Sequence, residues 1–331
     1  MQTDVQSGGK EMKAKKVFSF ISAGCMILSV GVGCTSQKTF EEPMDIAALN
    51  GPTGMGMTKV IQDKNKNYNI SLYQSADEIT GKIISGELEI ACVPSNLASV
   101  LYTKTEKNIS LLGVNTLGVL YIIENGQNIQ NVEDLKGQKI LASGQGSTPE
   151  YVLNQVLSGA GLEAGTDVEV TYLANHTEVI NALLAGEGTI ALLPEPHVTI
   201  AKTKDAALRT ALDLNEAWES AEGTSLPMGV IIARKDYVEA HPKEVEAFLK
   251  DYEASVKFVN EKQEEAAEMM VEVGLFEKAE IALNSIPNSH IVFEEGKEAQ
   301  ADLEQFYSIL QNVNPKAIGG SLPDETFYYA R

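Results

Sequence analysis

The sequence predicts an α/β protein built from two similar units, each a mainly parallel sheet flanked by helices. Three observations support this fold class. Strand and helix patterns alternate along most of the chain, and one strand–helix–strand pattern occurs twice. The chain is also long and apolar enough for two cores, with 331 residues of which 44% are hydrophobic.

The repeated pattern is clearest where SGELEIACVPSN, at residues 85–96, returns as AGEGTIALLPEP, at residues 185–196. Common ancestry would explain this match, and so would the general likeness of two strand–helix–strand units of similar length. Under either explanation each half of the chain contains a strand, a helix ended by glycine, and a second strand ended by proline. Extended backwards without a gap to residues 70 and 170, the two segments are identical at Glu78/Glu178, Gly86/Gly186, Glu87/Glu187, Ile90/Ile190, Ala91/Ala191 and Pro94/Pro194.

The elements of the first unit follow from apolar runs and from the turn residues between them. Apolar runs predict strands, and periodically spaced apolar residues predict helices. The β-α-β-α-β order favours a parallel sheet with helices on both faces. The predicted strands span residues 44–51, 68–75 and 88–94, and the predicted helices span 53–64 and 76–87.

The second unit opens with a strand at residues 139–142 that leads into a glycine-rich turn. Ser147 or Thr148 can cap the following helix, which has Pro149 in its first turn. The apolar run at residues 111–126 connects the two units, and amphipathic acidic helices are predicted after Pro242.

The N-terminal segment predicts export. Residues 12–37 have a lysine-rich start, an apolar run and small residues before Cys34, which is typical of a secretory signal. A permanent membrane span is the weaker interpretation, because glycines interrupt a short apolar run. We expect residues 1–33 to be a signal peptide and residues 34–42 to be a tether. Met12 is our hypothesis for the true start.

Composition argues against one class of partner. The formal net charge of -20 leaves few cations for a phosphate backbone, so we expect no nucleic acid ligand. Only three arginines, Arg209, Arg234 and Arg331, could clamp an anion bidentately.

These features together resemble a bacterial ABC-importer substrate-binding protein. The resemblance is carried by the VGVGC lipobox and by LNGPTGM, SGELEIACVPSN, LKGQKILASGQGSTPE, LLAGEGTIALLPEP and the C-terminal IGGSLPDETFYY. It is nearest to the nitrate, sulfonate, taurine and thiamine-precursor group, which has the two-lobed type II periplasmic-binding fold. The lipobox implies cleavage before Cys34 and lipidation of its thiol.

The resemblance also implies how the chain is divided and what it does. Lobe 1 would comprise residues 43–123 and 234–331, and lobe 2 residues 124–233. Hinge strands would join the lobes, and the C-terminal helices would pack mainly on lobe 1. We expect a monomer without a cofactor, anchored by lipid outside the cell membrane. It would close on a small organic or anionic nutrient and deliver it to a permease and an ATPase.

The candidate site residues follow from the rule that ligands bind beyond the carboxyl ends of strands, where helices begin. Each of these residues could equally serve only as a turn or a cap. The candidates are Gly51, Pro52, Thr53, Gly54, Met55, Ser75, Ser95, Asn96, Gly146, Ser147, Thr148, Asn175 and Glu195.

Glu195 is the one carboxylate among these candidates. In a cleft it would repel a simple anion and suit a ligand with an N–H or cationic group, whereas the alternative is that it caps the next helix.

Two other functions stay open. A metal-binding receptor would use His176, His197 and Glu195, and an enzyme on the same fold would need a convergent site that no motif here displays.

Overall fold

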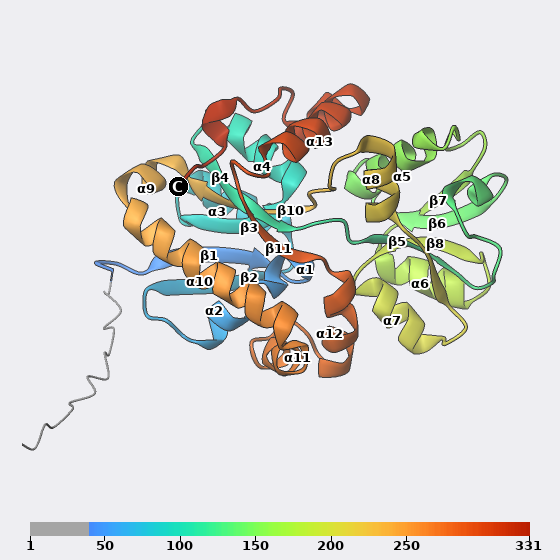
Figure 1. Cartoon of the computed structure of the whole chain (residues 1–331), viewed down its shortest axis with the longest axis horizontal. Coiled ribbons are helices and arrows are strands. Elements are labelled where there is room, and N and C mark those ends of the chain that lie inside the picture. Colours follow the sequence, from blue (N-terminus) through green and yellow to red (C-terminus); the bar gives the residue numbers. More distant parts are fainter. Residues whose placement is uncertain (1–39) are drawn as a thin grey trace, which may run out of the picture. The chain divides into compact units, whose positions relative to one another are not determined.

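The computed structural model describes residues 40–331, and the strands in this range form two sheets (Figure 1). The expected signal segment and Cys34 lie outside the described residues. No helix in the described range is long and apolar enough to cross a membrane.

The first sheet forms the centre of lobe 1. In the described chain its strand order is β2-β1-β3-β10-β4-β11. Strand β1 pairs parallel with β2 and β3, whereas β10 pairs antiparallel with β3 and β4. The strands are β1 (Met44–Leu49), β2 (Tyr68–Tyr73), β3 (Ile90–Pro94), β4 (Ile109–Thr116), β10 (Gly229–Arg234) and β11 (Ile291–Glu295).

The second sheet forms the centre of lobe 2. Its strand order in the described chain is β7-β6-β8-β5-β9, and β5 runs antiparallel to both of its neighbours. The predicted α/β class with two lobes is therefore confirmed. The expectation that each sheet is mainly parallel was wrong, because each sheet receives antiparallel strands beside its parallel core and is mixed. The strands are β5 (Leu120–Glu124), β6 (Lys139–Ser143), β7 (Glu169–Leu173), β8 (Ile190–Pro194) and β9 (Arg209–Asp213).

Helices follow most strands and cover both sheets (Figure 1). The helix expected over residues 53–64 is split in two near Gly56. The helices are α1 (Pro52–Met55), α2 (Thr58–Gln62), α3 (Ala76–Ser85), α4 (Ser95–Lys104), α5 (Thr148–Gly159), α6 (His176–Leu184), α7 (His197–Lys204), α8 (Leu214–Glu222), α9 (Lys235–Ala240), α10 (Pro242–Glu261), α11 (Gln263–Glu272), α12 (Ala279–Ser285) and α13 (Gln300–Val313), with short 3₁₀ turns at Val132–Leu135, Ile286–Asn288, Pro315–Ile318 and Glu325–Phe327.

The sequence repeat corresponds to a structural repeat. Strands β2 and β3 with helix α3 occupy the same places in lobe 1 as β7, β8 and α6 occupy in lobe 2. The pairing register also repeats, because Ile46 pairs with Ile90 and Ile140 pairs with Ile190. Both sheets then place an incoming antiparallel strand next to the second strand of the repeat.

These incoming strands correct the expected lobe boundaries. We expected residues 120–123 in lobe 1 and residues 229–233 in lobe 2, but the strand pairing places both segments in the opposite sheets. The chain therefore crosses between lobes before β5 and before β10. The shift arises because an apolar run shows that a strand is buried but does not show which sheet buries it.

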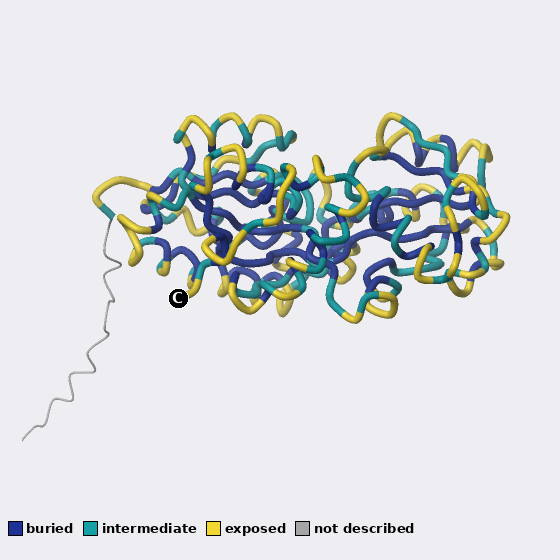
Figure 2. Tube along the Cα trace, turned by 90° about the horizontal axis from the view of Figure 1, so that it is seen from above, coloured by how far each residue is buried: buried dark blue, intermediate teal, exposed yellow. Residues whose placement is uncertain are grey.

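The C-terminal helices divide their contacts. Helices α10, α11 and α12 share a core with β1 and β10 of lobe 1, as the resemblance implied. Helix α13 also contacts lobe 2, where Phe306 packs edge-on against Trp218 of α8 at 6.0 Å between ring centroids. Figure 2 shows buried segments in both lobes and where they meet, and one hydrophobic cluster contains residues from both.

Gly54 gives a test of this packing. An added Cβ would lie 2.3 Å from the Leu49 carbonyl oxygen and 3.0 Å from Leu275 Cδ2. We expect Gly54→Ala to lower the free energy of unfolding by roughly 1–3 kcal/mol, because the backbone cannot yield easily. Gly81→Ala is the matched control, since Gly81 is exposed in α3 with open space around it. That change should be neutral or stabilising by up to about 1 kcal/mol. Urea denaturation measures both, and equal effects would contradict the tight contact.

Candidate functional site

The candidate site is a cavity of about 800 Å³ that residues of both lobes line; we call it the interlobe cleft. It lies where strands of both sheets end and helices begin, as the sequence rule predicted. Residues of the α11–α12 loop form a third wall. The lining residues are Asn50, Gly51 and Gln74 of lobe 1, Pro196, His197, Ile200, Thr203 and Lys204 of lobe 2, and Gly274, Leu275, Phe276, Glu277, Lys278 and Ile281 of the third wall.

Of the first loop, only Gly51 lines the cleft. Its φ of 107° lies in the region that favours glycine. Pro52 starts α1, and Gly54 and Met55 are buried beneath it. The Thr53 carbonyl oxygen accepts a hydrogen bond from Asn115 Nδ2 at 3.3 Å, which ties the loop to β4.

Four of the predicted site residues, three through side chains and Gly146 through its amide, form hydrogen bonds within their own turns. Ser75 Oγ accepts from the Asp77 amide at 3.2 Å, and Asn175 Oδ1 accepts from the Glu178 amide at 2.9 Å, so both are helix caps. The Gly146 amide donates to Glu150 Oε2 at 2.5 Å, and Ser147 Oγ donates to the Gly144 carbonyl at 2.5 Å.

Helices α4 and α5 begin without a side-chain cap. Ser147 precedes α5 but its hydroxyl is directed to Gly144, and Thr148 is the first helical residue. Pro94 precedes α4, and its side chain has no acceptor that could cap the helix. Amide groups in the first turns of both helices are consequently not satisfied by a capping side chain, and such groups favour an anion.

The adjacent side chains of Ser95 and Asn96 have different surroundings. Ser95 is 1% exposed, and its Oγ is buried without a hydrogen-bond partner. Its amide donates to the Met228 carbonyl at 3.1 Å. Asn96 Nδ2 donates to the Ala317 carbonyl at 3.3 Å, which directs this side chain to the C-terminal segment.

Glu195 is a buried carboxylate, only 2% exposed. It accepts from the amide and hydroxyl of Thr199, at 3.2 and 3.0 Å, and from Asn288 Nδ2 of lobe 1 at 3.4 Å. It forms no ion pair within the described residues, and burial raises its pKa. The carboxylate therefore caps α7 and joins the two lobes without an ion-pair partner among the described residues, and the charge of Lys202 partly opposes the effect of burial.

A second acid, Asp213, acts on the same tyrosine as Glu195. Burial and the charges of Asp213, Glu195 and Glu216 raise the pKa of Tyr121, whose hydroxyl donates to the Asn288 carbonyl at 2.7 Å. Sequence reasoning missed Asp213, which ends β9 and caps α8. The strand-end rule would have found it, had the strand at residues 209–213 been recognised.

Two histidines meet beside the cleft. The rings of His176 and His197 have centroids 4.6 Å apart, and His176 Nδ1 lies 2.6 Å from Ser143 Oγ. Burial lowers the pKa of both imidazoles, and that of His197 falls to about 4. No group of three or more metal-ligating side chains occurs in the described part of the chain.

The arginines are all engaged elsewhere. Arg209 pairs with Glu124 and Arg234 pairs with Asp236, each at the strand end far from the cleft. Arg331 pairs with Glu295 at 3.2 Å. An oxyanion in the cleft would therefore rely on helix amides, hydroxyls, imidazoles and lysines.

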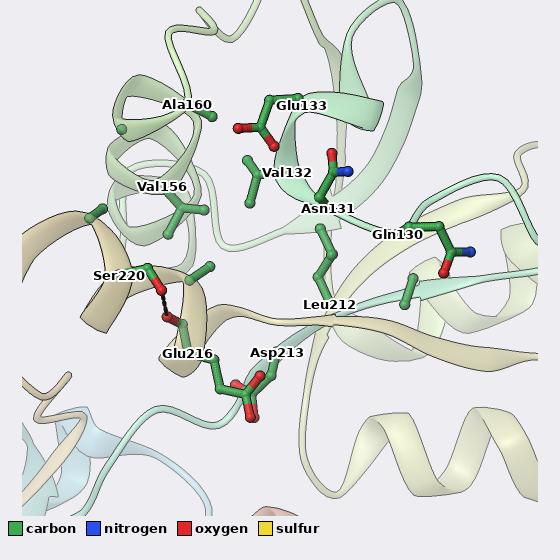
Figure 3. Close-up of a pocket in the computed structure, with 14 residues that line it drawn as sticks. Gln130, Asn131, Val132, Glu133, Val156, Ala160, Leu212, Asp213, Glu216 and Ser220 are labelled. Carbon is green, nitrogen blue, oxygen red and sulfur yellow. Dashed lines mark hydrogen bonds between the residues drawn. The ribbon is translucent and has the colours of Figure 1, made fainter.

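A second cavity, of about 440 Å³, belongs to lobe 2 alone (Figure 3). Asn131 and Glu133 line it on one side and Glu216 and Ser220 of α8 on the other, over the edge strand β9. Because lobe 1 contributes no lining residue, lobe closure would not enclose a ligand there.

Solved structures share this architecture. An ABC transporter from Parabacteroides distasonis is 25% identical, with a TM-score of 0.77, over 88% of this chain and 100% of that chain. The aliphatic sulphonate binding protein SsuA from Escherichia coli is 16% identical, with a TM-score of 0.70, over 88% and 93%. The alkanesulfonate-binding protein SsuA from Xanthomonas axonopodis pv. citri, bound to MOPS, is 14% identical, with a TM-score of 0.61, over 88% and 98%.

No curated protein matches the sequence. One family model matches residues 39–282, well over half of the chain, and describes the ABC transporter, phosphonate, periplasmic substrate-binding protein. Together with the two lobes and the cleft between them, this match shows that the chain belongs to that family and is the substrate-binding component of an ABC importer.

Proposed function

We propose that this protein captures a small zwitterion, with an amine at one end and a phosphonate or sulfonate at the other. The observation that carries the proposal is the unpaired carboxylate of Glu195. A buried charge without a counterion is destabilising, whereas an ammonium group from a ligand would neutralise it.

The opposite end of the ligand would meet helix N-termini. The uncapped starts of α4 and α5 offer amide groups, and the unpartnered Ser95 hydroxyl offers one more donor. The family description names phosphonate, and two structural neighbours are sulfonate-binding proteins. A tetrahedral oxyanion is consistent with both.

Delivery to the importer completes the proposal. The lobes would close around the ligand by a hinge motion at the two crossing segments, and the closed monomer would dock on a permease whose ATPase drives uptake. Lipidation at Cys34 would keep the protein at the outer face of the membrane. Neither a catalytic step nor a cofactor is required.

Ligand class is tested by thermal shift with matched compounds. We expect an aminoalkyl phosphonate or aminoalkyl sulfonate to raise the melting temperature more than the same compound without its amine, because only the zwitterion neutralises Glu195. Ser95→Ala should weaken binding by roughly ten- to a hundredfold through loss of one hydrogen bond to a charged group. Ser85→Ala, at an exposed hydroxyl in the same sequence motif, is the control. Equal responses to the amine-free compounds would refute the amine requirement.

The unpaired carboxylate also predicts a pH dependence. The folded pKa of Glu195 is raised above its ordinary 4.5, so the folded state holds the proton more tightly and loses stability as the pH rises from 4.5 through the folded pKa. We expect Glu195→Gln to gain stability relative to the wild type over that range, by about 1.4 kcal/mol for each tenfold difference in proton affinity between the folded and unfolded states. Urea denaturation at a series of pH values measures this gain. Glu187→Gln, at an exposed carboxylate, should show no such trend. A constant difference for Glu195→Gln would rule out the raised pKa.

Membrane anchoring has its own test. Metabolic labelling with a fatty acid should mark the wild type, and Cys34→Ser should lose the label and leave the membrane fraction. Cys25→Ser is the matched control and should retain both properties. Loss of label in the Cys25 variant alone would place the lipid elsewhere.

A further inference from the structure

We propose that His176 and His197 form a binding site for a divalent transition-metal ion at the interlobe cleft. The two histidines are the first residues of α6 and α7, which follow β7 and β8, the strands on either side of β6 in the lobe 2 sheet. Binding of the metal ion depends on these two residues and not on the proposed function. Its role, as the positive partner of the ligand's oxyanion, rests on the proposed function.

The ring geometry suits a shared ion. A zinc–nitrogen bond of about 2.0–2.1 Å places each imidazole centroid about 3 Å from the metal, so two ligands at about 90–110° have centroids about 4.5–5 Å apart. The observed separation is 4.6 Å, with the ring planes inclined at 52°. Stacked rings would be nearly parallel, as the rings of Tyr237 and His241 are at 18°.

A supporting group already orients one histidine. Ser143 Oγ lies 2.6 Å from His176 Nδ1. When Nδ1–H donates to this hydroxyl, Nε2 carries the free lone pair that a metal requires. His197 lines the cleft, and its Nδ1 is buried with no hydrogen-bond partner. Each histidine therefore has a nitrogen that no described contact uses.

The protein would supply two ligands to this ion, one from each imidazole of the pair. In the described range no third histidine, cysteine or carboxylate joins them as a cluster. The remaining coordination positions would be filled by water and by the oxyanion. Catalytic zinc sites keep one such position beside three protein ligands, whereas two imidazoles would leave at least two.

A metal ion would add positive charge to a cleft that has few cationic side chains. The charged residues that line the cleft are Lys204, Glu277 and Lys278, and the three arginines lie in other ion pairs. A chain with a net charge of -20 repels a dianion at long range. A divalent ion held by two neutral imidazoles would supply the strong local charge that the arginines do not.

The experiment measures zinc alone, without any ligand. The full chain is stripped with a chelator and titrated with Zn²⁺ by calorimetry, and Co²⁺ absorption reports nitrogen ligation. We expect one ion per chain. His176→Ala and His197→Ala should each weaken binding by at least about tenfold, and Ser143→Ala, which acts through His176, by about tenfold. His241→Ala, at a partly exposed histidine paired with Glu244, should leave the affinity unchanged.

Each outcome has a defined meaning. Circular dichroism of the metal-free variants separates misfolding from loss of a ligand, and the milder Ser143→Ala keeps the test valid if a histidine variant unfolds. The site is refuted if the wild type binds no zinc, or if the histidine variants bind it as the wild type does. Zinc binding that leaves zwitterion affinity unchanged would refute only the oxyanion role. Failure of every zwitterion to bind would refute the proposed function and leave the metal site standing.

Discussion

The exchange of one strand between the lobes is the constraint on which the rest of the structure depends. Strand β5 leaves lobe 1 and inserts antiparallel between β8 and β9, and β10 returns and inserts between β3 and β4. In both sheets the first residue of the incoming strand pairs with the proline that ends the repeat, Leu120 with Pro194 and Gly229 with Pro94. The incoming strands therefore enter each sheet at the end from which the cleft-lining loops after β1, β2 and β8 leave.

Close packing at the crossings leaves no room for a side chain at Gly118 or Gly229. A Cβ on Gly118 would lie 2.5 Å from Asn215 Cβ, and one on Gly229 would lie 2.5 Å from both Asn115 Oδ1 and Thr53 Cγ2. Asn115 and Asn215 stand at equivalent places, one at the end of β4 and one after β9. The side-chain amide of Asn115 donates to the Thr53 carbonyl of the loop after β1. The side-chain carbonyl of Asn215 accepts a hydrogen bond from the backbone amide of Gly118, which lies in the crossing before β5.

The sequence predicted the fold better than the site. Apolar runs and glycine stops located the repeat, because burial on both faces of a parallel strand leaves an uninterrupted pattern. Strand-end logic also led to the loops after β1, β2 and β8, which contribute residues to the cleft, but the loops before α4, α5 and α6 contribute none to its lining. It could not tell which side chains face a ligand, because Ser75, Asn96 and Asn175 had partners within the protein that only the folded chain reveals. The meeting of His176 with His197 likewise depends on how two helices pack, which spacing alone does not encode.

The position of helix α13 has a consequence for how the lobes can separate. Phe306 packs against Trp218, and Gln305 and Asn314 hydrogen-bond to Glu222 and Tyr151, so α13 and the residues after it hold lobe 2 by an apolar contact with polar support. At the α7 side, near the 3.4 Å contact between Asn288 and Glu195, separation would widen a cavity that is already present. Exposing aromatic surface is the more costly of the two. The cleft should therefore behave as a one-sided gate, with α13 as its closed edge and solute entering past α7 and α12.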